Sequence, residues 1–192
     1  MPSLVGRKVM KSKIIKIWFT GSHGTGKTTQ MHYFHRLHPE YQEINLEVRH
    51  LFEQGIIKIN EEAAPWDELV MQGQAMLGIL SATAPFVCDR SWIDKCAYAQ
   101  ALPYPQYLLD ALDDIDTAAF PGVENNETYF YFPPILEIEN DGVRSTNPQY
   151  QKEIDLLVQY YLNRFQIPYI TLESSSIQNR HFEICRAIGV SL

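Results

Sequence analysis

The chain has 192 residues, of which 45% are hydrophobic and 20% are charged, and its formal net charge is −7. This size and composition are typical of a soluble α/β domain with a sizeable core, and the acidic balance argues against nucleic acid as a partner. No apolar stretch is long enough to cross a membrane, so we expect no membrane partner. The basic start, residues 1–13, lacks the apolar core of a secretory signal, and we expect it to be an N-terminal extension of a cytoplasmic protein.

Strands and helices alternate along the chain, which predicts a parallel sheet flanked by helices. The predicted strands span residues 14–20, 41–46, 85–89, 128–132 and 168–172. The predicted helices span residues 28–37, 47–54, 66–81, 92–101, 106–116, a segment that opens at 150, and 177–188. Because no linker, repeat or low-complexity tract interrupts this order, we expect one domain over residues 1–192, with a central five-stranded parallel sheet in a three-layer α/β fold.

The segment after the first predicted strand matches the phosphate-loop pattern G-x-x-x-x-G-K-[ST], and it leads into a helix as that motif requires. Its glycines let backbone N–H groups turn toward a phosphate chain. Lys27 can reach the β and γ oxygens of ATP, and the Thr28 hydroxyl can coordinate Mg²⁺. The predicted nucleotide-binding residues are Gly21, Ser22, His23, Gly24, Thr25, Gly26, Lys27, Thr28 and Thr29. A glycine-rich turn that matches by chance is the alternative, and the strand–loop–helix context favours the P-loop NTPase fold over it.

The sequence offers no recognisable transition-metal pattern. Its three cysteines fit neither a disulfide framework nor a zinc motif, so we expect reduced thiols. Histidines recur at every third position along and just after the phosphate-loop helix, but no acidic or cysteine partner accompanies them at ligand spacing. We therefore expect these histidines, His32, His35 and His38, to lie on an exposed helix face. The cysteines expected to be reduced are Cys88, Cys96 and Cys185.

Asp89 ends the third predicted strand, at the sheet edge where open α/β folds bind ligands. Its carboxylate can hold Mg²⁺ directly or through water. Hydrolytic P-loop ATPases often place a glutamate after this acid to activate water, whereas the next residue here is Arg90. A cation in that position suits an anionic acceptor or a migrating phosphoryl group. The alternative is that Asp89 caps the following helix and Arg90 forms a surface salt bridge.

The segment that begins at Asp89 resembles part of the thymidylate kinase pattern D-R-Y-x-x-S-x-x-A-Y-Q, and its Ser91 is similar to the E-R-S segment of deoxyribonucleoside kinases. Overall the chain resembles the NadR-type P-loop kinase family (AAA_28-like), which includes nicotinamide riboside kinase domains. Three further segments carry this resemblance, namely Gly21–Thr29, Glu47-Val48-Arg49 and Asn140-Asp141-Gly142-Val143-Arg144. The chain departs from the thymidylate kinase pattern because Ser91 replaces the tyrosine after Arg90 and Asp94 replaces a serine.

The resemblance covers about residues 14–172 and implies a kinase that uses ATP and Mg²⁺. It makes Glu47 a candidate to accept or orient the acceptor hydroxyl, and Arg49 a clamp for the acceptor. The alternative is that Glu47 only begins a helix and that Arg49 lies on a solvated face. A homodimer is compatible with the sequence, which is silent on oligomeric state.

A lid is expected at about residues 138–150, where polar and turn residues lie between a strand and a helix. In a kinase Arg144 would touch the transferring phosphoryl group, whereas the alternative is a solvated arginine in an exposed loop. Trp92 and Tyr98, with Arg90, are the predicted acceptor-binding residues, since aromatic rings stack on nucleobases, and Trp66 is a further candidate.

These observations predict ATP-dependent phosphoryl transfer to a nucleoside, a (deoxy)nucleoside monophosphate or a similar small acceptor. One alternative is a P-loop ATPase or nucleotide switch that acts on a macromolecule. Against it, the sequence has no N-K-x-D guanine segment and no Asp-Glu pair after the third strand. A second alternative is a kinase acting on a modified base in DNA, which the acidic charge disfavours.

Overall fold

The computed structural model describes residues 15–45, 49–82, 85–119, 122–123, 126–140, 142–143 and 145–191. Two residues to which the sequence assigns catalytic roles, Glu47 and Arg144, lie outside these ranges, as does the expected extension over residues 1–13. The expected lid at residues 138–150 is described except at positions 141 and 144.

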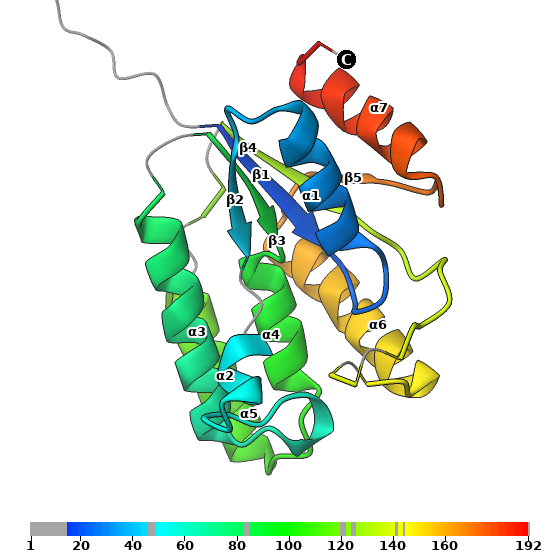
Figure 1. Cartoon of the computed structure of the whole chain (residues 1–192). Helices are drawn as coiled ribbons and strands as arrows, with labels where there is room; N and C mark the ends of the chain where they lie inside the picture. The colour runs from blue at the N-terminus through cyan, green and yellow to red at the C-terminus, as the bar shows by residue number, and fades with distance from the viewer. Residues whose placement is uncertain are drawn as a thin grey trace, which may run out of the picture.

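Five parallel strands form one central sheet with the order β2-β3-β1-β4-β5 (Figure 1). The strands are β1 (Lys16–Thr20), β2 (Gln42–Asn45), β3 (Phe86–Asp89), β4 (Glu127–Tyr131) and β5 (Tyr169–Thr171). Each lies within a predicted strand or starts one residue before it. β1 occupies the centre, paired with β3 on one side and β4 on the other. The predicted P-loop NTPase sheet is therefore confirmed.

Seven α-helices connect and flank the strands in the part of the chain that the structure describes. They are α1 (Lys27–Leu37), α2 (Arg49–Glu53), α3 (Pro65–Leu80), α4 (Trp92–Gln100), α5 (Gln106–Ala119), α6 (Pro148–Arg164) and α7 (Ile177–Ile188). Every predicted helix is present. Pro148 opens α6 two residues before the predicted start, because the Asn147 side chain accepts from the N–H groups of Gln149 and Tyr150 and caps the helix. A short 3-10 helix, η1 (Asn60–Glu62), was not predicted.

Alternating side chains of the strands build two separate cores, one on each face of the sheet. Ile17 and Phe19 of β1 point to the face that α1 and α7 cover, where they join the apolar residues of those helices. Trp18 points to the opposite face and packs with residues of α4 and α6. α5 packs outside this second layer, against α4. The result is the predicted three-layer arrangement, with α1 and α7 on one side of the sheet (Figure 1).

The helix α3 exposes several of its large apolar side chains and buries carboxylates. Its apolar residues Leu77 and Leu80 are 64% and 75% exposed, and Trp66 is 69% exposed. The residues it buries include Asp67 and Glu68. The helical period in hydrophobicity therefore predicted the helix correctly. The buried face of the helix nevertheless carries carboxylates, because it borders a polar interior.

The register of the sheet sets two loops beside each other at its carboxyl edge. Phe19, the residue before the end of β1, lies opposite Asp89, the last residue of β3. The chain therefore leaves β1 into Gly21 next to the point where it leaves β3 into Arg90. In open α/β sheets this crevice, where neighbouring strands are followed by connections in opposite directions, is the place where ligands bind.

Gly21 occupies a backbone position that a side chain would disrupt, and this predicts a loss of stability for Gly21→Ala. Its φ is +143°, and a Cβ there would lie 2.5 Å from the carbonyl oxygen of Phe132. Strain of this kind costs about 3 kcal/mol. Gly73→Ala is the matched control, because Gly73 lies in α3 with nothing within 4 Å of an added Cβ, and it should stabilise the helix by about 0.5 kcal/mol or more. Urea unfolding measures both, and an unchanged midpoint for Gly21→Ala would contradict the close approach to Phe132.

Candidate functional site

The phosphate loop connects β1 to α1 and leaves the first turn of that helix open to an anion. Gly24 and Gly26 adopt left-handed backbone angles, with φ of +74° and +85°. Gly26 is the N-cap of α1 and makes no side-chain cap. The N–H groups at the start of a helix have no intrahelical partner, and the helix dipole favours negative charge there. The loop therefore presents backbone donors to a phosphate group, as the sequence motif predicts.

Lys27 is held inside the curve of the phosphate loop. Its Nζ donates to the carbonyl oxygens of Gly21 at 2.7 Å and Ser22 at 2.6 Å, and to the Thr25 hydroxyl at 3.1 Å. The Thr25 hydroxyl in turn donates to the Ser22 carbonyl at 3.1 Å. Lys27 is buried, at 5% exposure, so the protein alone holds its ammonium group at the centre of the loop.

Thr28 and Asp89, from the two adjacent loops, meet directly. The Thr28 hydroxyl donates to Oδ2 of Asp89. Asp89 is 3% exposed, and its Oδ1 is buried without a hydrogen-bond partner in the described part of the chain. A buried carboxylate oxygen without a partner is costly unless a cation or donor satisfies it. The hydroxyl and carboxylate oxygens are hard ligands of the kind that Mg²⁺ prefers.

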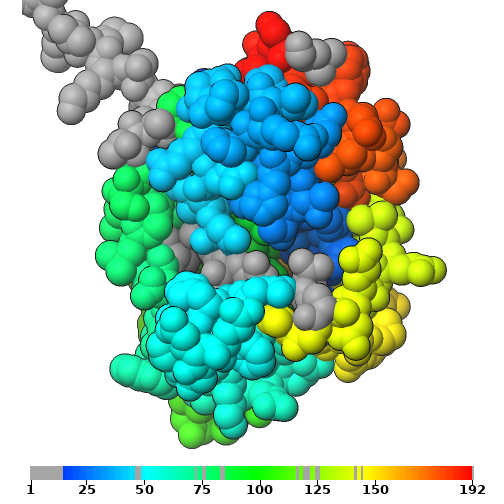
Figure 2. Space-filling model, in the orientation of Figure 1, coloured from blue at the N-terminus to red at the C-terminus, as the bar shows by residue number. Residues whose placement is uncertain are grey.

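The two loops line a cleft of about 370 Å³, a volume that includes its part open to solvent. Figure 2 shows this side of the molecule, hollowed between the blue, cyan and yellow segments, with green atoms at its floor. Every predicted nucleotide-binding residue from position 23 onward lines it. The lining residues are His23, Gly24, Thr25, Gly26, Lys27, Thr28, Thr29, Asp89 and Arg90.

Arg90, the residue that follows β3, has an unusual backbone conformation. Its φ is +84°, which is rare for a residue with a side chain, and its N–H donates to the carbonyl of Phe19 at 3.0 Å. The guanidinium carbon lies 4.8 Å from the ring centre of Tyr98. Burial alone would lower the pKa of Arg90, but Tyr98 and the carboxylates of Asp94 and Asp89 raise it above its usual value. The side chain is therefore a fixed cation beside Asp89.

Asp94 joins the two loops through a buried carboxylate, a role that the sequence did not suggest. Its Oδ1 accepts from the N–H of Gly21 at 3.0 Å, and its Oδ2 accepts from the Thr20 hydroxyl at 2.8 Å. The same Oδ2 accepts from the N–H and the hydroxyl of Ser91 at 2.7 and 2.9 Å. Asp94 is 0% exposed. Its position three residues after Ser91 matches a helix capping box, which is the sequence signal that could have identified it.

Two side chains from the C-terminal half of the chain hold the other side of the phosphate loop. Gln151 of α6 donates from Nε2 to the carbonyl of His23 at 2.7 Å. Arg180 of α7 donates from Nη1 to the carbonyl of Thr25 at 2.9 Å, and its guanidinium carbon lies 5.0 Å from the ring centre of Phe132. No sequence motif points to either residue, because each acts on a loop more than a hundred residues away.

Next to Arg90 the interior is polar and charged. Burial and the nearby Arg90 lower the pKa of Lys95 to about 8, although Glu68 and Asp94 act in the opposite direction. Both Lys95 and Glu68 are buried, at 6% and 3% exposure. Burial, with Glu68 and Asp67 as further causes, raises the pKa of Tyr104 to about 12. A group of carboxylates, cations and phenols therefore lies close to Arg90.

Tyr150, at the start of α6, borders this polar region. Its ring lies 5.8 Å from that of His23 and 6.3 Å from that of Tyr98. Its residue is 4% exposed, and its hydroxyl is buried with no hydrogen-bond partner in the described ranges. The Tyr98 hydroxyl, by contrast, lies 3.0 Å from Nδ1 of His23. Tyr150 therefore offers a buried polar group that the protein itself does not use, and sequence analysis did not single it out.

The segment expected to form a lid contacts the 3-10 helix η1. Asn60 of η1 donates from Nδ2 to the carbonyl of Val143 at 2.8 Å. Ser145 donates from its hydroxyl to Oε1 of Glu61, also at 2.8 Å. In Figure 2 the yellow segment meets the cyan segment below the hollow. The loop after β4 thus passes beside Gly24 at Ile138 and reaches η1 at Val143 and Ser145.

The remaining predicted residues lie as follows. Tyr98 lies under the guanidinium of Arg90 and is not among the residues that line the cleft. Trp92 is 8% exposed and belongs to the apolar core formed with α4 and α6, so its ring has mainly core neighbours. Arg49 begins α2 and is partly buried. Trp66 projects from α3 and is largely exposed.

The fold and the phosphate-loop site together define a P-loop NTPase. A family model described as an AAA domain (AAA_28) matches residues 16–180, and the chain belongs to that family. This membership confirms the relationship to NadR-type P-loop kinases that the motifs predict. No curated protein sequence gives a significant match. None of the described helices is long and apolar enough to cross a membrane.

Solved structures share the fold at low sequence identity. A NadR protein in complex with NR is 19% identical with a TM-score of 0.74, and the match covers 93% of this chain and 53% of that one. The chain therefore spans about half the length of that protein. A deoxyadenosine kinase from M. mycoides with dCMP and dCDP bound is 13% identical, with a TM-score of 0.68 and coverage of 91% and 98%. A thymidylate kinase from Candida albicans is 14% identical, with a TM-score of 0.64 and coverage of 92% and 92%.

The buried carboxylate of Asp94 predicts that Asp94→Asn weakens both the fold and nucleotide binding. An amide cannot accept at both oxygen positions, so one N–H or hydroxyl donor of Gly21, Thr20 or Ser91 would face another donor. Losing hydrogen bonds to a buried charge costs about 2 kcal/mol. Asp110→Asn on α5 is the control, since Asp110 is exposed and its carboxylate accepts from the side chain of Gln106 one turn earlier, and it should change stability by less than about 0.5 kcal/mol. Urea unfolding measures the stability and ATP titration measures the nucleotide affinity. If both quantities were the same for the two variants, the role of Asp94 in joining the two loops would be excluded.

Proposed function

We propose that the protein transfers the γ-phosphoryl group of ATP, with Mg²⁺, to a nucleoside, a (deoxy)nucleoside monophosphate or a similar small acceptor. The observation that carries this proposal is the Thr28–Asp89 pair at the phosphate loop, with Oδ1 of Asp89 buried and lacking a partner among the described residues. A hydroxyl and a carboxylate that converge beside a phosphate cradle fit a Mg²⁺–triphosphate complex, and no other feature of the cleft explains that oxygen.

Each part of the phosphate loop has a role in this proposal. The N–H groups at the start of α1 bind the phosphate oxygens, and Lys27 exchanges its bonds to loop carbonyls for bonds to β and γ oxygens. Thr28 and Asp89 hold the Mg²⁺ ion, which supplies positive charge that neutralises the phosphates when bound. Asp94, Gln151 and Arg180 are positioning residues, because they hold the loop and not the nucleotide.

Transfer to an acceptor is favoured over hydrolysis by the charge of the residues after β3. A general base for water would have to lie close to the γ-phosphate, yet the residue that follows Asp89 is the protonated Arg90. A fixed cation stabilises negative charge on a migrating phosphoryl group or binds an anionic acceptor. This supports a kinase in preference to the ATPase or switch that the phosphate loop alone would allow.

The acceptor site is proposed beside Arg90, where Lys95, Glu68 and Tyr150 border a polar interior. Hydroxyl and amide groups of a nucleoside can pair with buried polar groups, and the Tyr150 hydroxyl would gain most, because it has no hydrogen-bond partner among the described residues. The candidate roles of Glu47 and Arg49 toward the acceptor, and of Arg144 as an arginine in cis at the lid, are part of this proposal. The contacts of η1 with Val143 and Ser145 support closure of that lid over the cleft.

The proposal is tested by measuring ADP formation with a panel of nucleosides and nucleoside monophosphates. A kinase releases ADP at a rate that one or a few acceptors stimulate strongly, and the acceptor gains phosphate in equal amount. An ATPase or switch turns over without an acceptor, and this result would overturn the proposal. A kinase for DNA bases would respond only to DNA, with binding that falls steeply as salt rises. Lys27→Ala is the inactive reference, since it removes the cation at the centre of the loop.

Asp89→Asn should abolish Mg²⁺-dependent turnover while leaving the fold intact. Replacing one oxygen with an amide nitrogen removes the charge that holds the ion, and metal stabilisation of the transition state is worth several kcal/mol, so kcat should fall at least about a hundredfold. Asp114→Asn, an exposed position on α5, is the control with the same chemical change. Initial rates across a Mg²⁺ titration measure the effect. Full activity of Asp89→Asn would remove this carboxylate from the mechanism.

Tyr150→Phe should stabilise the free protein and weaken acceptor binding. The Tyr150 hydroxyl is buried without a partner in the described residues, so removing it relieves a desolvation cost of about 1 kcal/mol. If this hydroxyl binds the acceptor, KM for the acceptor rises while KM for ATP stays unchanged. Tyr129→Phe is the control, because its hydroxyl already donates to Glu127 at 3.3 Å, within the core. Thermal unfolding and acceptor titrations give the two readouts, and an unchanged acceptor KM would place the acceptor elsewhere.

A further inference from the structure

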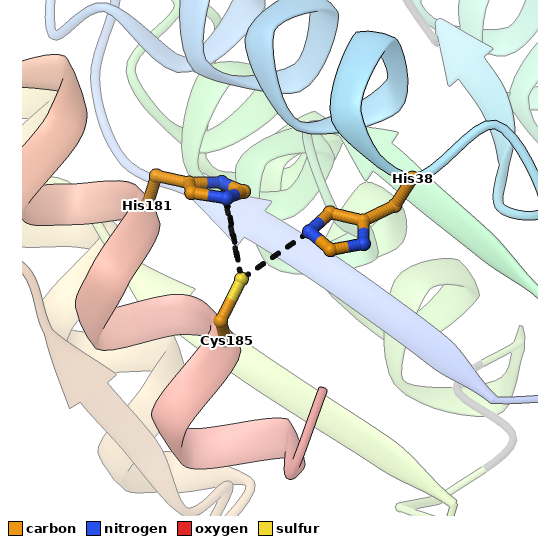
Figure 3. Close-up of side chains that lie close together, drawn as sticks. All are labelled: His38, His181 and Cys185. Carbon is orange, nitrogen blue, oxygen red and sulfur yellow. Dashed lines mark hydrogen bonds between the residues drawn. The ribbon is translucent and has the colours of Figure 1, made fainter. Parts of the chain in front are cut away.

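Three side chains with metal-binding atoms converge on the face of the sheet that α1 and α7 cover, away from the nucleotide cleft. His38 follows the C-terminus of α1, while His181 and Cys185 lie one turn apart on α7. The Sγ of Cys185 lies 3.4 Å from Nε2 of His38 and 3.4 Å from Nε2 of His181 (Figure 3). One ligand atom from each residue fits within a group whose members are at most 4.8 Å apart. All three residues are buried, at 7%, 5% and 0% exposure.

The spacing of these atoms matches the edges of a zinc coordination tetrahedron. Zinc binds histidine nitrogen at about 2.0–2.1 Å and cysteine sulfur at about 2.3 Å, so a tetrahedral angle places nitrogen and sulfur about 3.6 Å apart. Both measured separations of 3.4 Å are close to this value. Figure 3 shows the imidazoles of His38, which follows α1, and of His181, on α7, both turned toward the sulfur of Cys185.

The neighbours of the two histidines constrain their rings. The Nδ1 atom of His38 lies 3.7 Å from Oε1 of the exposed Glu40, while its Nε2 lies beside the sulfur. The rings of His38 and His181 lie 5.2 Å apart and nearly parallel, and Phe34 packs against both. These ring contacts hold the two imidazoles in place beside the Cys185 sulfur.

Metal binding requires a neutral imidazole nitrogen from each histidine and a thiolate from the cysteine. Binding therefore forms one Zn–S bond and two Zn–N bonds and releases one proton from Cys185 to solvent. No oxidant or reductant is involved, because zinc does not change its oxidation state.

We propose that His38, His181 and Cys185 bind one Zn²⁺ ion, with a water molecule in the fourth tetrahedral position. The ion joins the end of α1 to the middle of α7. The nucleotide cleft lies at the other end of α1, about 16 Å away for a helix of 11 residues. The residue before His181 is Arg180, which supports the phosphate loop through the carbonyl of Thr25. The metal therefore has a structural role, in which it keeps α7 in register with α1.

The experiment measures zinc on the whole purified chain, first by metal analysis and then by titration against a competing chelator. We expect one zinc ion per chain, a rise in the thermal unfolding temperature on adding Zn²⁺, and release of one proton per ion in a weakly buffered solution. Co²⁺ should substitute and give the charge-transfer absorption of a cobalt–thiolate bond. A wild-type chain that binds no zinc, or whose bound cobalt lacks that absorption, would overturn the proposal, since a packed Cys–His–His cluster would then account for the geometry.

Variants assign the ligands. Cys185→Ser, His181→Gln and His38→Gln should each lower zinc affinity at least about a hundredfold, since even loss of a partner behind a ligand costs 10–100-fold. His32→Gln is the matched histidine control, because His32 is exposed on α1 and pairs with Glu43. Asp89→Asn controls for binding at the nucleotide cleft. Both controls should keep one zinc ion. Where one ligand variant does not fold, the other two decide, and zinc retained by the ligand variants or lost with Asp89→Asn would refute the site.

Discussion

The buried carboxylate of Asp94 is the interaction on which the geometry of the cleft depends. The sheet register brings the ends of β1 and β3 side by side, but register alone does not fix the loops that follow. Asp94 accepts hydrogen bonds from both loops, at Gly21 and at Ser91, and it has no exposed surface. Thr28 and Asp89 can meet only if these loops keep their relative position. A single charge that four donors satisfy therefore sets the distance between the phosphate cradle and the carboxylate proposed to hold the metal.

The charge distribution around the cleft differs from that of the whole chain. The chain carries a net charge of −7, yet Lys27 and Lys95 are buried, and the partly buried Arg90 lines the cleft. Burial, and then Arg90, lower the pKa of Lys95, whereas Tyr98, Asp94 and Asp89 raise the pKa of Arg90. In the proposed function, Lys27 and Arg90 are the cations that would face the triphosphate.

The sequence predicted the fold and the phosphate loop because both depend on local patterns. Alternating apolar segments gave the strands, and the spacing of Gly21, Gly26 and Lys27 determined the loop. It did not predict which face of α3 is buried, because Glu68 is directed inward by a polar interior that only the assembled fold creates. The roles of Gln151 and Arg180 were missed for a related reason, since each acts on the loop from a helix far along the chain. Likewise, His38 gains its neighbours on α7 only through packing across the face of the sheet.

The helix α7 shows how these distant contacts act together. Arg180 and Ser176 lie in its first turns, and the Arg180 side chain bonds the carbonyls of Thr25 and Ser174. Its later turns pack Ile184 and Cys185 into the core shared with α1. Since α1 is a rigid element between these two contacts, a shift of α7 along its axis would move the support of the phosphate loop and the His38 cluster at once. The helix α7 therefore supports the phosphate loop, although no residue in it lines the cleft.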